Sequence, residues 1–288
     1  MSTPLDLQCI NTLRFLSVDM VQQAGSGHPG LPLGTATMAY ALWTGHLKHH
    51  PTNPQWPDRD RFVLSAGHGS ALLHSLLHVT GYDLPLDELK RFRQGAARRP
   101  ATRNVATRRA WKSPPARLVR AWRIRWAWRL PKHTWQRATT AGHRPVDHRT
   151  WALVSDGDLM EGVSAEAASL AGHLQLGKLV CLYDDNRVTL SAGADITFSE
   201  DSALRFQACG WQTLVVDDGN DLDAVNAALA AACAEVTRPS LILVRTHIGF
   251  GSPEQDTFKG AWLVARRRRR EAYQADAGLA AGPVVSRA

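Results

Sequence analysis

The chain has 288 residues, and its 34 Lys and Arg outnumber 26 Asp and Glu to give a net charge of +8. That charge favours a partner that carries phosphate or another anion, and the length is enough for one large domain or two ordinary ones. No apolar run of about 18 residues is present, which excludes a membrane-spanning helix, and residues 1–9 are too polar for a signal peptide. The four cysteines are widely spaced without a metal-binding pattern, so we expect reduced thiols and a cytoplasmic location.

Apolar periodicity and helix-end signals predict an alternation of helices and short strands. The first helix begins after Thr3, which is suited to cap it, and stops at Gly25. Further helices are expected over residues 35–47, 67–79, 159–173 and 222–236, and strands over 61–65, 151–154, 179–183, 213–216 and 241–244. This alternation predicts an α/β fold in which helices cover both faces of a parallel sheet. Ligands of such folds bind beyond the carboxyl ends of the strands, so the residues that directly follow each strand are candidate functional residues.

The basic residues are concentrated in two segments that interrupt this pattern. Residues 95–145 contain 12 Arg, 2 Lys, five Trp and no Asp or Glu, and residues 260–288 contain 6 Arg against two acids. The remainder of the chain has more acidic than basic residues, as a moderately acidic globular domain would. One interpretation of residues 95–145 is a nucleic-acid-binding arm, because Arg contacts phosphates and Trp stacks on bases. A solvent-exposed Arg-rich loop is the alternative, although five Trp argue against it.

Two glycine-rich loops each present a histidine. The loop over residues 25–30 has the glycine spacing of a dinucleotide-binding loop, but a helix precedes it and Pro29 stands where an amide is needed. We interpret it as a tight loop that presents His28, with an incidental histidine at a helix end as the alternative. The second loop, residues 65–69, lies where a strand gives way to a helix N-terminus, and His68 there is placed to bind a phosphate or a substrate hydroxyl.

Acidic and amide side chains follow two successive predicted strands. Asp156-Gly157-Asp158 comes directly after one strand, and Asp184-Asp185-Asn186 directly after the next. Oxygen ligands from the two clusters would suit Mg²⁺, with a carboxylate from Asp156, an amide oxygen from Asn186 and the main-chain oxygen of Val188. A single carboxylate is sufficient if the ligand is a diphosphate, which brings its own charge. Ordinary Asp-Gly and Asp-Asn turns after strands are the alternative.

Four segments of the chain carry a resemblance to a known family: residues 26–30, 58–69, 156–162 and 248–253. Together they resemble the N-terminal, diphosphate-binding domain of transketolase. The 30-residue step from Asp156 to Asn186 also agrees with the thiamine-diphosphate motif of that family. The resemblance covers residues 1–94 and 146–259, which we expect to form one thiamine-diphosphate-binding domain.

The resemblance implies a site and an activity. Asp156, Asn186 and the carbonyl of Val188 would hold Mg²⁺ or another divalent cation, and Gly157 would contact the diphosphate. His28 and His68 would line the cofactor and sugar channel as catalytic residues, and His68 would also contact thiamine diphosphate. The family enzymes act as homodimers in the pentose phosphate pathway and transfer a two-carbon ketol unit from a ketose phosphate to an aldose phosphate. The cofactor provides the electron sink for the carbon–carbon cleavage.

The family has two further functional segments in the middle of this domain, and neither is present in this chain. Their expected place coincides with residues 95–145. Synonymous codons can be chosen for residues 115–121 so that a shifted frame encodes the family's Gly-Pro-Leu-Gly-Gln-Gly loop. In the same shifted frame, residues 99–104 can encode the family's Pro-Gly-His-Pro-Glu loop. We therefore interpret residues 95–145 as an out-of-frame segment restored near Val146, and residues 260–288 as a second out-of-frame tail. A sequencing error or a decayed gene would explain both.

The resemblance also bears on what this chain does alone. Family enzymes need a glutamate and an aromatic pocket from a pyrimidine-binding domain, and the chain ends before that domain would begin. We therefore expect the chain by itself to be inactive, as a fragment of a transketolase. One alternative is the N-terminal subunit of a split transketolase with a separate C-terminal subunit, and an alternative of another class is a nucleic-acid-binding protein that uses residues 95–145. Deoxyxylulose phosphate synthase, a related thiamine enzyme, is disfavoured by residues 58–69.

Overall fold

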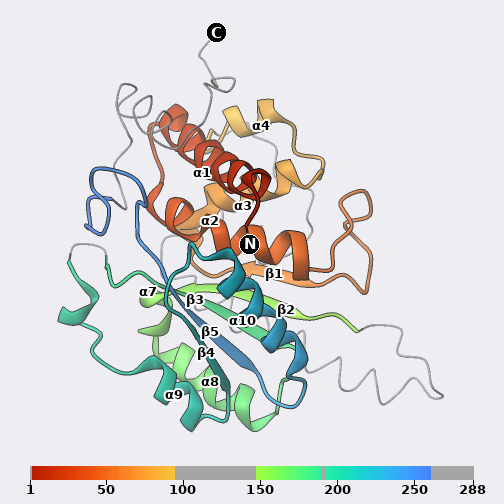
Figure 1. Cartoon of the computed structure of the whole chain (residues 1–288), viewed down its shortest axis with the longest axis vertical. Coiled ribbons are helices and arrows are strands. Elements are labelled where there is room, and N and C mark those ends of the chain that lie inside the picture. The colour runs from red at the N-terminus through yellow and green to blue at the C-terminus, as the bar shows by residue number, and fades with distance from the viewer. Residues whose placement is uncertain (1, 95–146, 190–191, 261–288) are drawn as a thin grey trace.

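The computed structural model describes residues 2–94, 147–189 and 192–260. The predictions made for residues 95–145 and for the tail after Gly260 lie outside these ranges. The described part alternates helices and strands along the chain (Figure 1). Its helices are α1 (Pro4–Ala24), α2 (Gly30–Ala41), the π-helical turn η1 (Leu42–His46), the 3₁₀ turn η2 (Gly67–Gly69), α3 (Ser70–Val79), α4 (Leu86–Lys90), α7 (Asp156–Leu159), α8 (Gly162–His173), the 3₁₀ turn η4 (Ala194–Ile196), α9 (Ser202–Ala208) and α10 (Leu222–Ala234).

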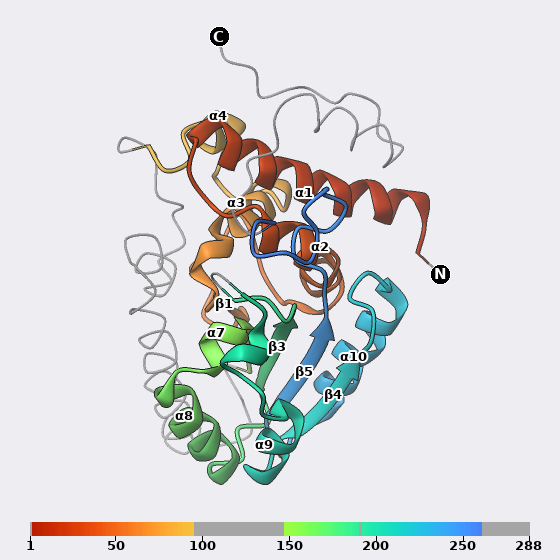
Figure 2. The ribbon, with the colours of Figure 1, turned by 90° about the vertical axis from the view of Figure 1, so that its left-hand side faces the viewer.

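The strands form one parallel sheet in the order β1-β2-β3-β5-β4. Figure 2 shows β3, β5 and β4 side by side, with α10 beside them. In the pairing of β2 with β3, Val154 lies opposite Tyr183 and Ser155 opposite Asp184. The predicted parallel α/β fold is confirmed. The strands are β1 (Arg61–Leu64), β2 (Thr150–Ser155), β3 (Leu179–Asp185), β4 (Gln212–Val216) and β5 (Ser240–Arg245).

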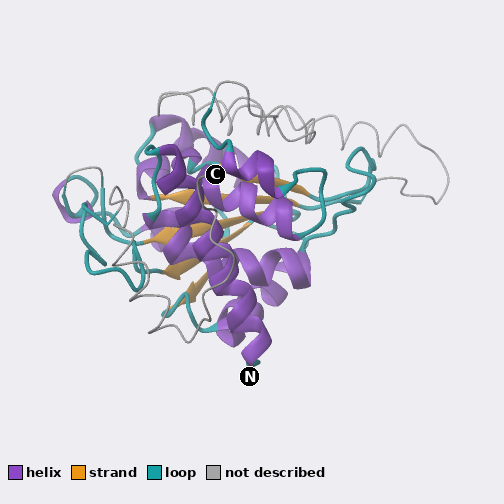
Figure 3. Cartoon of the chain, turned by 90° about the horizontal axis from the view of Figure 1, so that it is seen from above, coloured by secondary structure: helices purple, strands orange, loops and turns teal. Residues whose placement is uncertain are grey.

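The sheet separates two hydrophobic clusters because successive side chains of a strand point to opposite faces. From β2, Trp151 and Leu153 belong to a cluster that also contains residues of α1, α2, α3 and α10. Ala152 and Val154 belong to the other cluster, together with residues of α8 and α9. Figure 3 shows the strands enclosed by helices. Both faces are therefore covered, and the strands are apolar on both sides, as a buried parallel sheet requires.

The helix boundaries differ most from the sequence prediction in two places. The second helix begins at Gly30 rather than at residue 35. Pro32 is tolerated there because the first-turn amides of a helix have no intrahelical acceptor. The helix expected over residues 159–173 is instead two helices, since Glu161 adopts an extended conformation between α7 and α8. The first helix has the expected ends: Thr3 forms a capping box with Asp6, and Gly25 closes the helix in the left-handed conformation with φ of 60°.

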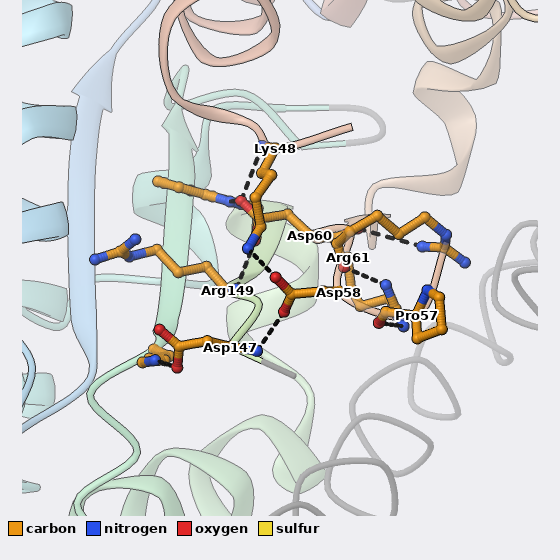
Figure 4. Close-up of polar contacts among 10 residues, drawn as sticks. Lys48, Pro57, Asp58, Asp60, Arg61, Asp147 and Arg149 are labelled. Atoms are coloured by element: carbon orange, nitrogen blue, oxygen red, sulfur yellow. Dashed lines mark hydrogen bonds and ion pairs between the residues drawn. The ribbon is translucent and has the colours of Figure 1, made fainter. Parts of the chain in front are cut away.

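Two aspartates anchor the start of β2 to the loop that precedes β1 (Figure 4). Asp60, which is 6% exposed, accepts hydrogen bonds from the backbone amides of Arg149 (2.6 Å) and Lys48 (3.0 Å) and from the indole of Trp151 (3.0 Å). Asp58 accepts from the backbone amide of Asp147 and pairs with the Lys48 ammonium at 2.6 Å. These contacts hold β1 and β2 in register at their amino ends. The carboxyl ends of the two strands are thereby aligned as well.

None of the helices in the described ranges is long and apolar enough to cross a membrane. No disulfide joins the four cysteines, all of which lie within those ranges.

Candidate functional site

The residues selected from the sequence gather at the carboxyl edge of the sheet. Asp156 begins α7 directly after β2, and Asn186 follows β3, the neighbouring strand. His68 lies in η2, just beyond the end of β1 on the other side of β2. Figure 2 shows α7 near the ends of the strands, below the helices of the N-terminal segment. The sheet order therefore brings three separate sequence segments to one edge.

Asp156 is the central acid of this edge and is only 2% exposed. Its Oδ1 accepts a hydrogen bond of 2.5 Å from the Tyr183 hydroxyl, whereas its buried Oδ2 has no hydrogen-bond partner among the described residues. Burial raises the pKa of Asp156 to about 6, although the bond from Tyr183 opposes that rise. Burial also raises the pKa of Tyr183 well above its usual range, so the phenol remains a donor. A buried carboxylate oxygen without a partner is costly unless a cation or a donor reaches it.

Asn186 is held by Asp184, a buried acid of β3. Its Nδ2 donates to Asp184 Oδ2 at 2.8 Å, and the Thr246 hydroxyl donates to the other oxygen of Asp184. Asn186 Oδ1 accepts from the backbone amide of Val188 at 3.0 Å, which leaves one of its lone pairs for a further contact. Burial raises the pKa of Asp184 to about 7. The Asp184 contact sets the orientation of the amide, with its oxygen directed away from that carboxylate.

Asp158 has a structural part in the same edge. Its Oδ2 accepts from the backbone amide of Ser155 at 2.9 Å, and its Oδ1 accepts from the Ser65 hydroxyl at 3.0 Å. Ser65 directly follows β1, so Asp158 ties the end of β1 to the start of α7. Burial raises the pKa of Asp158 to about 6. Because both of its oxygens accept hydrogen bonds, Asp158 is less suited than Asp156 to bind a cation.

The donor set at this edge is of the kind that a small hard cation takes. Among the described residues, no group of three or more His, Cys, Asp or Glu side chains is arranged so that it could hold a metal ion by itself. This edge offers instead one carboxylate with an unpartnered oxygen, one amide oxygen and main-chain carbonyls, and Mg²⁺ takes such ligands with phosphate oxygens. A methyl group added at Gly157 would meet no heavy atom within 4 Å, so the backbone beside Asp156 is open to a ligand.

The two loop histidines come together although 40 positions separate them in the sequence. The rings of His28 and His68 lie edge to face with centroids 5.6 Å apart. Burial lowers the pKa of His68 to about 4 and also lowers that of His28, and the nearby Arg93 guanidinium lowers the pKa of His28 further. Arg93 is itself held by a 2.9 Å hydrogen bond to the Ser26 hydroxyl in the same loop. Both imidazoles are therefore neutral at pH 7, and each has one donor and one acceptor nitrogen.

Three contacts at this edge were not predicted from the sequence. The sequence pattern identifies Tyr183 only as a strand residue and Ser65 only as the first residue of the 65–69 loop, and it does not single out Thr246. Each acts on a residue far away in the sequence, which a local pattern does not reveal. The parallel register of β2 and β3 would have indicated the contact of Tyr183 with Asp156. It places Tyr183 opposite Val154, which comes two residues before Asp156 in the chain.

Comparisons with known proteins identify one family for this chain. A family model described as transketolase, thiamine diphosphate binding domain, matches residues 5–266. The transketolase of Geobacillus stearothermophilus is 44% identical over 280 residues, covering 95% of this chain and 42% of that protein. The transketolase of Halalkalibacterium halodurans is 47% identical over 256 residues, covering 88% of this chain and 38% of that protein.

Solved structures show the same relationship. The transketolase structure from Campylobacter jejuni matches with a TM-score of 0.85 at 38% identity and covers 97% of this chain and 43% of its own. The Pichia stipitis transketolase in complex with sedoheptulose-7-phosphate matches with a TM-score of 0.87 at 35% identity, over 96% of this chain and 41% of its own. This chain thus spans about two fifths of the length of these relatives. On this evidence of sequence and fold, the chain belongs to the transketolase family and contains its thiamine-diphosphate-binding domain.

Proposed function

We propose that this chain provides the diphosphate-binding part of a transketolase that depends on thiamine diphosphate and Mg²⁺. The reaction would transfer a two-carbon ketol unit from a ketose phosphate to an aldose phosphate. The observation that carries the proposal is the buried, unpartnered Oδ2 of Asp156, which lies at the same sheet edge as Asn186. The family membership supports it independently.

In this proposal Asp156 Oδ2, Asn186 Oδ1 and the carbonyl of Val188 bind the cation, and the backbone at Gly157 accommodates the diphosphate. One protein carboxylate is enough because the diphosphate contributes the remaining negative charge. The amide of Asn186 adds an oxygen ligand without adding charge. Burial of the Asp156 carboxylate strengthens its attraction for a cation, since the alternative is an uncompensated charge in a poorly solvated site.

His28 and His68 would bind and orient the sugar. Their depressed pKa values keep the rings neutral, so each nitrogen can donate to or accept from a sugar hydroxyl and move a proton without first losing one to water. When bound, thiamine diphosphate supplies a nucleophilic carbon and an electron sink, which amino-acid side chains lack. The two rings lie within van der Waals reach of each other, so one sugar can contact both.

Catalysis would require a longer enzyme than these 288 residues. The matched relatives are more than twice as long as the matched region, so the pyrimidine-binding part would come from outside the 288 residues. We propose that the chain alone does not turn over sugar phosphates. It would act in the pentose phosphate pathway of the cytoplasm, either within a homodimer of a longer protein or as the N-terminal subunit beside a separate C-terminal one.

Ligand-dependent stability tests the binding step without requiring turnover. Thiamine diphosphate with Mg²⁺, each at about 100 times its dissociation constant, should stabilise the chain by about 2.7 kcal/mol and raise the melting temperature by a few degrees. Asp156→Asn should remove the shift, whereas Asp87→Asn, a surface control, should keep it. The proposal fails if thiamine diphosphate and Mg²⁺ do not shift the unsubstituted chain, or if Asp156→Asn shifts equally.

A turnover assay tests the proposal that the chain alone does not convert sugar phosphates. The chain is assayed with a ketose phosphate and an aldose phosphate, alone and after mixing with the separately produced C-terminal remainder of a related transketolase. Turnover is expected only in the mixture. Turnover by the chain alone would refute the proposed need for further residues.

A further inference from the structure

The guanidinium of Arg93 joins the loop that presents His28 to a different part of the fold. We propose that Arg93 is a positioning residue that holds His28 against His68, in the arrangement in which both rings can contact one sugar. This inference rests on the proposed function, because that function assigns the sugar to these two histidines. Arg93 acts through His28 and is not itself a sugar ligand.

The loop that carries His28 needs an anchor from outside. It joins α1 to α2, and both Gly25 and Gly27 have positive φ, of 60° and 140°. Glycine adopts these conformations and many others at low cost, so the two residues do not by themselves fix the direction of His28. Ser26 lies between them, and its hydroxyl accepts a 2.9 Å hydrogen bond from Arg93 Nη1. The anchor is therefore made in the middle of the loop, two residues before His28.

Arg93 is fixed at its own end by a buried neighbour. Phe92 is 3% exposed, and its ring lies edge to face with that of His74 in α3, with centroids 5.4 Å apart. The Arg93 guanidinium lies 5.8 Å from the centroid of the Phe92 ring, within the range of a cation–π contact. Because α3 directly follows η2, the segment that carries His68 also holds Phe92. The bond from Arg93 to Ser26 therefore sets the loop of His28 relative to His68.

The backbone of Arg93 is in an unfavourable conformation. Its φ of 60° lies in the left-handed region, which a residue with a Cβ atom rarely adopts. Such conformations persist where the surrounding structure requires them, and they are concentrated at functional sites. Here the strained conformation is the one in which the side chain reaches Ser26, 67 positions earlier in the sequence. The strain thus supports a role for this contact.

The charge of Arg93 acts on His28 as well. Burial is the main cause of the lowered pKa of His28, and the guanidinium lowers it further because it repels a proton on the ring. His68 also faces His28, but it is neutral at pH 7, since burial lowers its own pKa to about 4. The titration of His28 therefore reports on the presence of the guanidinium beside it.

Nuclear magnetic resonance of the full chain with ¹³C-labelled histidine tests the inference without cofactor or turnover. Arg93→Met keeps much of the side-chain length but removes the charge and the donor. It should abolish the nuclear Overhauser effect between the His28 and His68 rings and raise the pKa of His28 toward its ordinary value. Arg93→Lys, which keeps a positive charge and a donor, should restore both in part. The two rings are assigned with His28→Gln and His68→Gln.

Arg91→Met is the matched control. Arg91 is exposed and pairs with Glu88 at 3.6 Å, so its removal should change neither the Overhauser effect nor the pKa of His28. Ser26→Ala is a second variant, which removes the acceptor and retains Arg93. It should also abolish the Overhauser effect, and it gives an answer even if Arg93→Met does not fold.

A kinetic measurement adds a readout of function. In the mixture of the chain with the C-terminal remainder of a related transketolase, Arg93→Met should lower kcat/KM for the ketose phosphate by about 10- to 100-fold, the cost of misplacing a group that orients the substrate. Arg93→Lys should recover part of the loss, and Arg91→Met should leave kcat/KM unchanged.

The outcomes separate this inference from the proposed function. An Overhauser effect that persists in Arg93→Met or in Ser26→Ala overturns the inference, even if the pKa of His28 rises, because loss of the charge alone would raise it. An unchanged pKa in Arg93→Met also overturns it, as does an active mixture that keeps its kcat/KM. If thiamine diphosphate and Mg²⁺ do not stabilise the unsubstituted chain, the proposed function fails, and the resonance data alone decide how His28 is held.

Discussion

Replacement of Asp60 by Ala should be among the most destabilising single changes in this domain. The carboxylate is buried and accepts three hydrogen bonds: two from backbone amides, at Arg149 and Lys48, and one from the Trp151 indole. Hydrogen bonds to charged acceptors contribute about 1.5–3 kcal/mol each, but they are not additive. We therefore expect Asp60→Ala to lower the free energy of unfolding by about 3–5 kcal/mol. Asp60→Asn, which keeps one carbonyl oxygen, should lose roughly half of that.

Equilibrium urea unfolding of the full chain, followed by far-ultraviolet circular dichroism, measures the effect. Asp87→Ala is the control, because the Asp87–Lys90 pair is on the surface and should change stability by less than about 1 kcal/mol. A double-mutant cycle with Trp151→Phe isolates the indole contact, for which we expect a coupling of about 1–2 kcal/mol. A loss below about 1 kcal/mol for Asp60→Ala would refute the argument that this carboxylate joins β1 to β2.

Two further predictions concern packing and pH. In Gly172→Ala the new Cβ would lie 1.5 Å from the Cys209 carbonyl oxygen, so α8 must shift. We expect the free energy of unfolding to fall by about 2–4 kcal/mol. Gly162→Ala is the control: its Cβ would meet no atom within 4 Å, and the free energy of unfolding should stay within about 0.5 kcal/mol. The pKa of His68 is about 4 in the folded chain and 6.5 when unfolded, so the unfolded chain binds a proton at this residue first as the pH falls. The stability that the neutral side chain contributes is therefore fully present above pH 6.5 and is lost as the pH falls toward 4. That loss is at most about 3.4 kcal/mol, from about 1.36 kcal/mol per pKa unit. His68→Gln should remove this part of the pH dependence of unfolding, and identical pH profiles for the two chains would contradict the prediction.

Much of the fold was accessible from the sequence because each strand is a short apolar run between turn residues. Asp156 and Asn186 could be placed at one edge for the same reason, since parallel strands end on the same side. The break at Glu161 could not be predicted, because helical periodicity continues across it. The same holds for the π-helical turn after Ala41, which extends a segment that already reads as helix.

The finer structure of the candidate site depended on contacts between distant residues. The bond from Tyr183 to Asp156 requires the exact pairing of β2 with β3, and the approach of His28 to His68 requires the packing of α2 on η2. Neither register nor packing is encoded in a local pattern. Residue types and strand ends therefore indicated which side chains matter, and the tertiary structure determined how each is held.

The anchoring of the Asp147 and Arg149 amides by Asp58 and Asp60 means that β2 is seated by side chains that precede β1. Each of these two contacts joins residues that are 89 positions apart in the sequence. The entry of the chain into β2 is therefore determined by tertiary contacts with the segment before β1, and a change at Asp58 or Asp60 would be felt in a strand far from it in sequence.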